Sequence, residues 1–93
     1  TLQKERKAMK EFEHVIMDPV GLHARPAGLL VKKAMEYPEV DIHLIKGEKT
    51  VDAKRLFSVM SLGAKQGDSL RIRLEGKGEE QAEKALKEFF ASL

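Results

Sequence analysis

The chain has 93 residues, contains no cysteine, and carries 17 basic residues against 15 acidic ones, for a formal net charge of +2. This length suits one small domain, and the lack of cysteine excludes disulfide frameworks, thiol catalysis and cysteine-ligated zinc. The mixed charge argues against nucleic acid as a partner, no apolar run reaches the length of a membrane span, and no secretory signal is visible, so we expect a cytoplasmic protein without membrane insertion.

The first eight residues are polar and lack a periodic apolar face. We expect residues 1–8 to be a flexible extension or a cloning remnant, with a short amphipathic helix as the alternative. Residues 9–93 are then expected to form a single domain.

A strand followed by a helix is expected to open this domain. Residues 11–17 are rich in β-branched and apolar side chains, which predicts a strand, and Asp18 with Pro19 forms the turn that ends it. Apolar residues then recur at helical spacing, and Pro26 stands in what would be the first turn, where its missing N–H has no cost. We therefore expect a helix over about 24–36.

Turn residues and alternating apolar residues predict a hairpin, a short helix and a further strand in the middle of the chain. The expected elements are a strand at 40–44, a turn at 46–48, a return strand at 49–51, a helix over about 54–61 and a strand at 70–74. Asp52 is placed to cap the short helix.

The last segment predicts an amphipathic helix. Its apolar face contains Ala82, Ala85, Leu86 and Phe89, and its polar face carries the ion pairs Glu80–Lys84 and Glu83–Lys87. The element order is then βαββαβα. This order predicts an α+β fold, an open-faced β-sandwich in which a four-stranded antiparallel sheet carries three helices on one face.

The stretch GLHARPA, residues 21–27, predicts an anion-binding site. The first amides of a helix have no intrahelical acceptor, and together with the helix dipole they favour a bound anion. His23 would place a nucleophilic imidazole at this point, with the guanidinium of Arg25 beside it, which suits a phosphoryl group. The alternative is that His23 only caps the helix and Arg25 is a solvated surface charge.

Two longer segments carry a family resemblance. GLHARPAGLLVKKA, residues 21–34, and KTVDAKRLFSVMSLGAKQGDSL, residues 49–70, resemble the two signatures of the HPr family, the histidine-containing phosphocarriers of the bacterial phosphoenolpyruvate-dependent sugar phosphotransferase system. The spacing of the segments and the βαββαβα order also match that family, over essentially the whole chain from Met9.

The resemblance implies a role for each site residue. His23 would accept a phosphoryl group on Nδ1 from a phosphohistidine on enzyme I and pass it to a histidine of a sugar-specific EIIA domain. Arg25 would neutralise the phosphoryl charge, and the amides of Ala24 and Arg25 would hold its oxygens. The chain would be a covalent carrier rather than a stand-alone enzyme, and a monomer. No cofactor or metal is expected, since the three histidines are too scattered for a ligand set.

The resemblance also implies a docking surface on the short middle helix. Leu56, Phe57 and Met60 would form an exposed apolar patch beside the histidine, while Val59 and Leu62 face the core. The alternative is that all three patch residues are core.

Cations near the histidine add a second expectation. Lys54 and Arg55 lie in the first turn of the expected helix, where positive charge opposes the helix dipole at a small energetic cost. Either the two cations have no function, or they serve to bind an acidic partner. In the second case they act together with Arg25 and Lys32 to steer that partner toward the site.

Arg55 departs from the family pattern. Many relatives have a serine at this position, which some lineages phosphorylate for regulation, and arginine cannot take that modification. We therefore expect this chain to lack the switch. Two other function classes stay open: a regulatory module that acts by docking alone, and a small basic nucleic-acid binder, against which the balanced charge already argues.

Overall fold

The computed structural model describes residues 9–93, so the expectation for residues 1–8 lies outside the described part of the chain. The elements occur in the predicted order. They are β1 (Met9–Val15), α2 (Ala24–Ala34), β2 (Val40–Lys46), β3 (Lys49–Asp52), α3 (Leu56–Ser61), β4 (Ser69–Gly76) and α4 (Glu79–Ala91).

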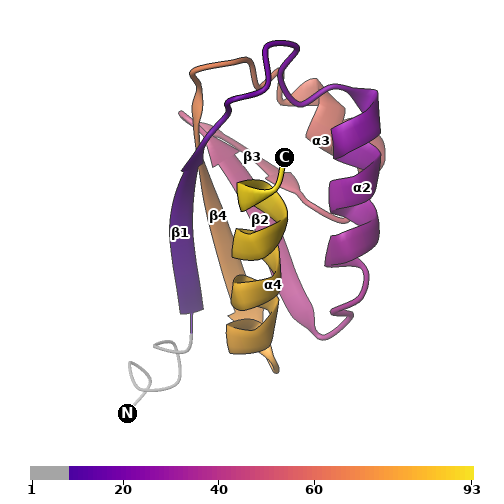
Figure 1. Cartoon of the computed structure of the whole chain (residues 1–93). Helices are drawn as coiled ribbons and strands as arrows, with labels where there is room; N and C mark the ends of the chain where they lie inside the picture. The colour runs from indigo at the N-terminus through magenta and orange to yellow at the C-terminus, as the bar shows by residue number, and fades with distance from the viewer. Residues whose placement is uncertain (1–8) are drawn as a thin grey trace.

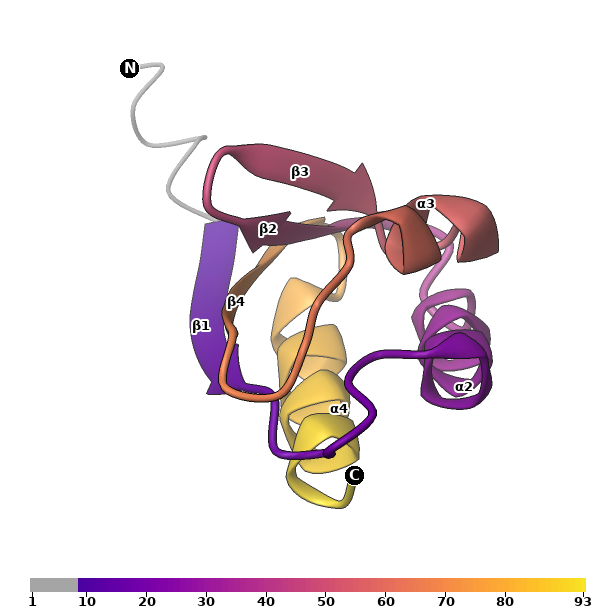
Figure 2. The same cartoon turned by 90° about the horizontal axis from the view of Figure 1, so that it is seen from above.

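The four strands form one antiparallel sheet in the order β1-β4-β2-β3. The three helices cover one of its faces, as Figures 1 and 2 show, so the predicted open-faced α+β sandwich is confirmed. α2 and α3 pack against each other, which brings the start of α2 and the whole of α3 to the same end of the molecule (Figure 1).

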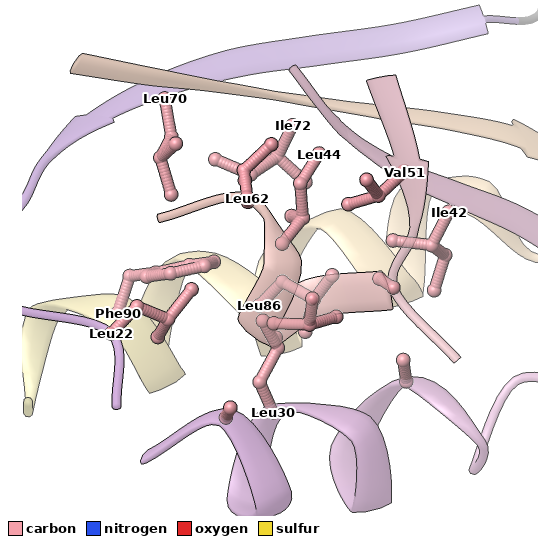
Figure 3. Packing of buried hydrophobic residues seen from close by; sticks show 14 of the residues in the cluster. Leu22, Leu30, Ile42, Leu44, Val51, Leu62, Leu70, Ile72, Leu86 and Phe90 are labelled. Carbon is pink, nitrogen blue, oxygen red and sulfur yellow. The ribbon is translucent and has the colours of Figure 1, made fainter. Parts of the chain in front are cut away.

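The core lies between the sheet and the helices. Strand residues alternate between the two faces, so Leu70, Ile72 and Leu74 of β4 all point inward and are fully buried. They belong to one buried cluster with side chains of α2 and α4, and Figure 3 shows Leu70 and Ile72 together with Leu30 and Leu86 of that cluster. This packing fixes where each helix sits on the sheet.

Several predicted boundaries need correction. α2 ends at Ala34 rather than near residue 36, and β2 runs to Lys46, which the sequence pattern assigns to the turn. β1 ends at Val15, but Ile16 continues to exchange backbone hydrogen bonds with Gly67 and Asp68, which explains its strand-like sequence. α3 begins at Leu56 rather than at residue 54, because Asp52 Oδ1 accepts from the backbone N–H of Lys54 in a local turn and so does not cap the helix.

The last helix presents a slightly different face than predicted. Phe90, not Phe89, is fully buried, because it continues the stripe of Ala82 and Leu86 at four-residue spacing. Phe89 is half-buried and meets Phe90 edge to face. Of the expected ion pairs, Glu83–Lys87 forms at 3.6 Å, whereas Glu80 lies 3.7 Å from Lys10 of β1 instead of pairing with Lys84.

Candidate functional site

His23 is the residue immediately before α2 and is exposed. Its backbone is extended, with φ −85° and ψ −169°, and its carbonyl accepts the first helical hydrogen bond from the N–H of Ala27 at 2.9 Å. Its imidazole makes no capping hydrogen bond. His23 therefore occupies the N-cap position of α2, as the alternative expected, but it caps through its backbone alone, and its ring is available for other chemistry.

Two backbone N–H groups in the first turn of α2 are free to bind an anion. Within residues 9–93, the backbone N–H groups of Ala24 and Arg25 have no acceptor, and Pro26 has no N–H to offer. The first turn contains no acidic side chain that would compete for these donors. The helix dipole adds positive potential at the same place, so the turn favours an anion next to the imidazole.

Gly21 allows the chain to enter this turn. Its φ of +81° favours glycine, and a Cβ there would lie 2.5 Å from the carbonyl oxygen of Ala64 and 3.0 Å from Cα of Lys65. The next residue, Leu22, is buried, and its N–H donates to the same Ala64 carbonyl at 3.0 Å. The segment that presents His23 is therefore bound closely to the loop between α3 and β4.

His23 and Arg25 line one open hollow of about 280 Å³. Its other walls are Asp18, Pro26, Leu29 and Leu93. The structure thus brings the two predicted site residues together and adds neighbours that sequence reasoning did not assign. Leu29 could have been found, because it is apolar and lies outside the buried helical stripe that includes Ala27 and Leu30.

The predicted apolar patch is exposed. The exposed fractions are 82% for Phe57, 38% for Met60 and 36% for Leu56, while Val59 and Leu62 are buried. The alternative in which all three patch residues belong to the core is wrong. A phenyl ring left almost entirely in water is unusual for a surface without a partner.

Lys54 does not lie as predicted among free surface cations. It precedes α3, is half-buried, and its Nζ donates to the carbonyls of Tyr37 at 2.8 Å and Val40 at 2.6 Å. Its charge is therefore directed at the backbone between α2 and β2. Arg55, the residue immediately before α3, is exposed, as is Lys32 on α2.

Comparison with known proteins agrees with this geometry. The family model "PTS HPr component phosphorylation site" matches residues 10–92. The chain belongs to the HPr family of the phosphotransferase system.

Individual HPr proteins match over most of their length. Phosphocarrier protein HPr from Lysinibacillus sphaericus is 40% identical over 78 residues, covering 84% of this chain and 88% of that protein. An HPr structure from Thermoanaerobacter tengcongensis is 41% identical with a TM-score of 0.84, covering 89% of this chain and 92% of the other. The histidine-containing phosphocarrier protein of a Mycoplasma is 36% identical with a TM-score of 0.83, covering 86% and 90%.

The other two histidines of this HPr family member lie in different surroundings. The ring of His14, on β1, packs on Phe90 with centroids 4.8 Å apart, and burial lowers the pKa of its imidazole below 6.5. His43 lies half-buried on β2. Across residues 9–93 no group of three or more His, Asp or Glu side chains could hold a metal ion, and no helix in that range is long and apolar enough to span a membrane.

Proposed function

We propose that His23 carries a phosphoryl group between two partner proteins. It accepts the group on Nδ1 from a phosphohistidine of enzyme I, which phosphoenolpyruvate has charged, and passes it to a histidine of a sugar-specific EIIA domain. The observation that carries the proposal is an exposed imidazole directly before a helix whose first two amides are free. Membership of the HPr family supports the same chemistry.

Each transfer is a displacement at phosphorus. An unprotonated imidazole nitrogen attacks, a new P–N bond forms as the donor's P–N bond breaks, and the released electron pair returns to the donor imidazole. Charge accumulates on the phosphoryl oxygens during this exchange, so fixed donors around them lower the barrier. In our proposal the amides of Ala24 and Arg25 and the Arg25 guanidinium supply those donors.

The docking surface in this proposal is the patch of Leu56, Phe57 and Met60. Its support is their exposure on α3, which packs against α2. Arg55, immediately before α3, and Lys32, on α2, are exposed cations and would steer an acidic partner. We leave Lys54 out of the surface, because its ammonium is already bound to two backbone carbonyls.

Two further parts of the proposal concern regulation and setting. With Arg55 immediately before α3, where a serine would be the target, the chain lacks the regulatory phosphorylation site. The protein acts as a monomeric cytoplasmic carrier rather than as a stand-alone enzyme. Phosphorylation by a serine kinase of the family, followed by mass measurement, tests the first point, and light scattering tests the oligomeric state.

The decisive experiment is phosphorylation of His23. Incubation with phosphoenolpyruvate and enzyme I is expected to add one acid-labile phosphate to the chain. The variant His23→Ala should lose it, and the matched control His43→Ala should keep it. A wild-type chain that takes up no phosphate, or a sugar relay that runs normally with His23→Ala, would favour a regulatory docking module.

A titration with oligonucleotides at low salt tests the nucleic-acid alternative. We expect no binding signal, and that result would exclude this alternative.

A further inference from the structure

Hydrogen bonds join two loops next to His23. The first runs from Ile16 to His23, and the second from Gly63 to Asp68. Four hydrogen bonds join them: Ile16 N–H to Asp68 O at 2.9 Å, Gly67 N–H to Ile16 O at 2.8 Å, Gln66 Nε2 to Met17 O at 3.2 Å, and Leu22 N–H to Ala64 O at 3.0 Å. Only the last of these lies next to His23, so the orientation of the Ala64 carbonyl bears most directly on the site.

Asp68 binds the same peptide unit from the other side. Its Oδ2 accepts from the backbone N–H of Lys65 at 2.8 Å. That N–H and the Ala64 carbonyl belong to one planar peptide group, so holding the N–H also orients the carbonyl. The hydrogen bond to the N–H polarises the carbonyl as well, which strengthens the bond that it accepts from Leu22.

Lys46 of β2 braces this arrangement from the sheet. Its Nζ lies 3.4 Å from Asp68 Oδ2 and donates to the carbonyl of Gly63 at 3.1 Å. The ammonium therefore links the two ends of the second loop. The backbone N–H of Lys65 and then the Lys46 ammonium lower the pKa of the Asp68 carboxyl, so the group is charged at neutral pH.

We propose that Asp68, braced by Lys46, is a positioning residue for His23, acting through the Ala64–Lys65 peptide group and the N–H of Leu22. The inference rests on the proposed phosphoryl transfer. Asp68 does not reach the hollow itself, since its Oδ2 is engaged with Lys65 and Lys46. Its effect is on the geometry of the residue that enters α2, and a small displacement of a reacting group slows a reaction markedly.

The experiment compares Asp68→Ala with Asp68→Asn, which keeps an oxygen acceptor for the Lys65 N–H. The control is Asp41→Ala, because Asp41 is exposed on β2 and opposite Glu75, remote from both loops. Hydrogen exchange of the Leu22 amide should quicken about fivefold in Asp68→Ala, as expected for one lost hydrogen bond. Exchange at Ile72, in the middle of the sheet, should stay as in the wild type.

The kinetic readout separates positioning from docking. With Asp68→Ala as the acceptor, the kcat of enzyme I should fall roughly tenfold while the KM of enzyme I for the chain stays unchanged. Asp68→Asn should restore both the Leu22 exchange rate and kcat, and Asp41→Ala should alter neither. Asp68→Ala with wild-type Leu22 exchange and wild-type kcat would overturn the inference, as would a loss confined to KM.

The exchange measurement needs no partner protein. If the wild-type chain takes up no phosphate, the proposed function fails, whereas the coupling of Asp68 to Leu22 is still measured by exchange. If the wild type is phosphorylated but Asp68→Ala changes neither readout, only the positioning role fails.

Discussion

The backbone N–H of Leu22 donates to the carbonyl of Ala64 at 3.0 Å, across 42 positions of the sequence. This bond fixes the residue before His23 to the loop after α3. The segment that presents His23 and the loop that follows the patch-bearing helix are therefore joined by a hydrogen bond, which explains how a small surface site can be held in place without a deep pocket.

Gly21→Ala tests that junction directly. The new Cβ would meet the Ala64 carbonyl at 2.5 Å and sit on a backbone with φ +81°, so we expect a loss of roughly 2 kcal/mol or more in the free energy of unfolding. Chemical denaturation measures it. Gly28→Ala is the control: a Cβ added there would meet nothing within 4 Å beyond its own stretch of α2, and the change should stabilise the protein by about 0.5–1 kcal/mol. Equal stability of the two variants would contradict the close approach.

Arg25→Ala should slow transfer and leave the fold intact. Arg25 is exposed in the first turn of α2 and lines the hollow with His23, so its loss removes charge stabilisation but no packing. We expect a decrease of roughly 10- to 100-fold in the transfer rate from enzyme I. Lys77→Ala, an exposed cation between β4 and α4, serves as the control and should transfer normally. An unchanged rate in Arg25→Ala would remove the guanidinium from the mechanism.

Phe57→Ala should weaken docking with little effect on stability. Its ring is 82% exposed, so truncation leaves no cavity, and the expected result is a higher KM of enzyme I for the variant with an almost unchanged melting temperature. Phe90→Ala makes the matched comparison, since the ring of Phe90 is 2% exposed and its loss should cost about 3–5 kcal/mol. A melting temperature that falls as far in Phe57→Ala as in Phe90→Ala would place Phe57 in the core.

Lys54→Met should destabilise the protein, whereas Arg55→Met should not. Lys54 donates to the carbonyls of Tyr37 and Val40, and removing the ammonium leaves both acceptors without it, for an expected loss of about 1–2 kcal/mol. Arg55 is exposed and should be close to neutral in stability, with its effect confined to the association rate with enzyme I. Urea denaturation and stopped-flow binding separate the two. A Lys54→Met variant with unchanged stability and slower association would instead place Lys54 in the docking surface.

The burial of His14 should make the free energy of unfolding decrease at acidic pH. Burial lowers its pKa in the folded protein, so the unfolded chain binds the proton more tightly. The contribution is complete above the ordinary pKa of 6.5 and is lost as the pH falls through the lower folded-state value. Denaturation at pH 7.5 and 5.5 should show a smaller decrease in His14→Gln than in the wild type, and the control His43→Gln should keep the wild-type decrease. An equal decrease in His14→Gln would exclude His14 as the cause.

The local features of the site could be predicted from the sequence. The start of α2 depends on Pro26 and on the apolar spacing that follows it, and the free amides are a property of any helix start. The alternation in β2 and β4 likewise decides which side chains face the core, because the period of a strand leaves no choice once one face is buried. Such features depend on neighbours within a few residues.

The tertiary structure alone decided the features that depend on distant partners. Lys54 looked like a free cation because its acceptors lie 14 and 17 residues away, and the close approach of Gly21 to Ala64 has no local sequence signal because the two residues are far apart in the chain. Phe89 and Phe90 both fit an apolar helical stripe, and only the way α4 packs on the sheet determines that Phe90 is the buried one. A sequence pattern specifies which backbone conformation a segment prefers, whereas the direction of a charge and the burial of a ring follow from the segments that meet it.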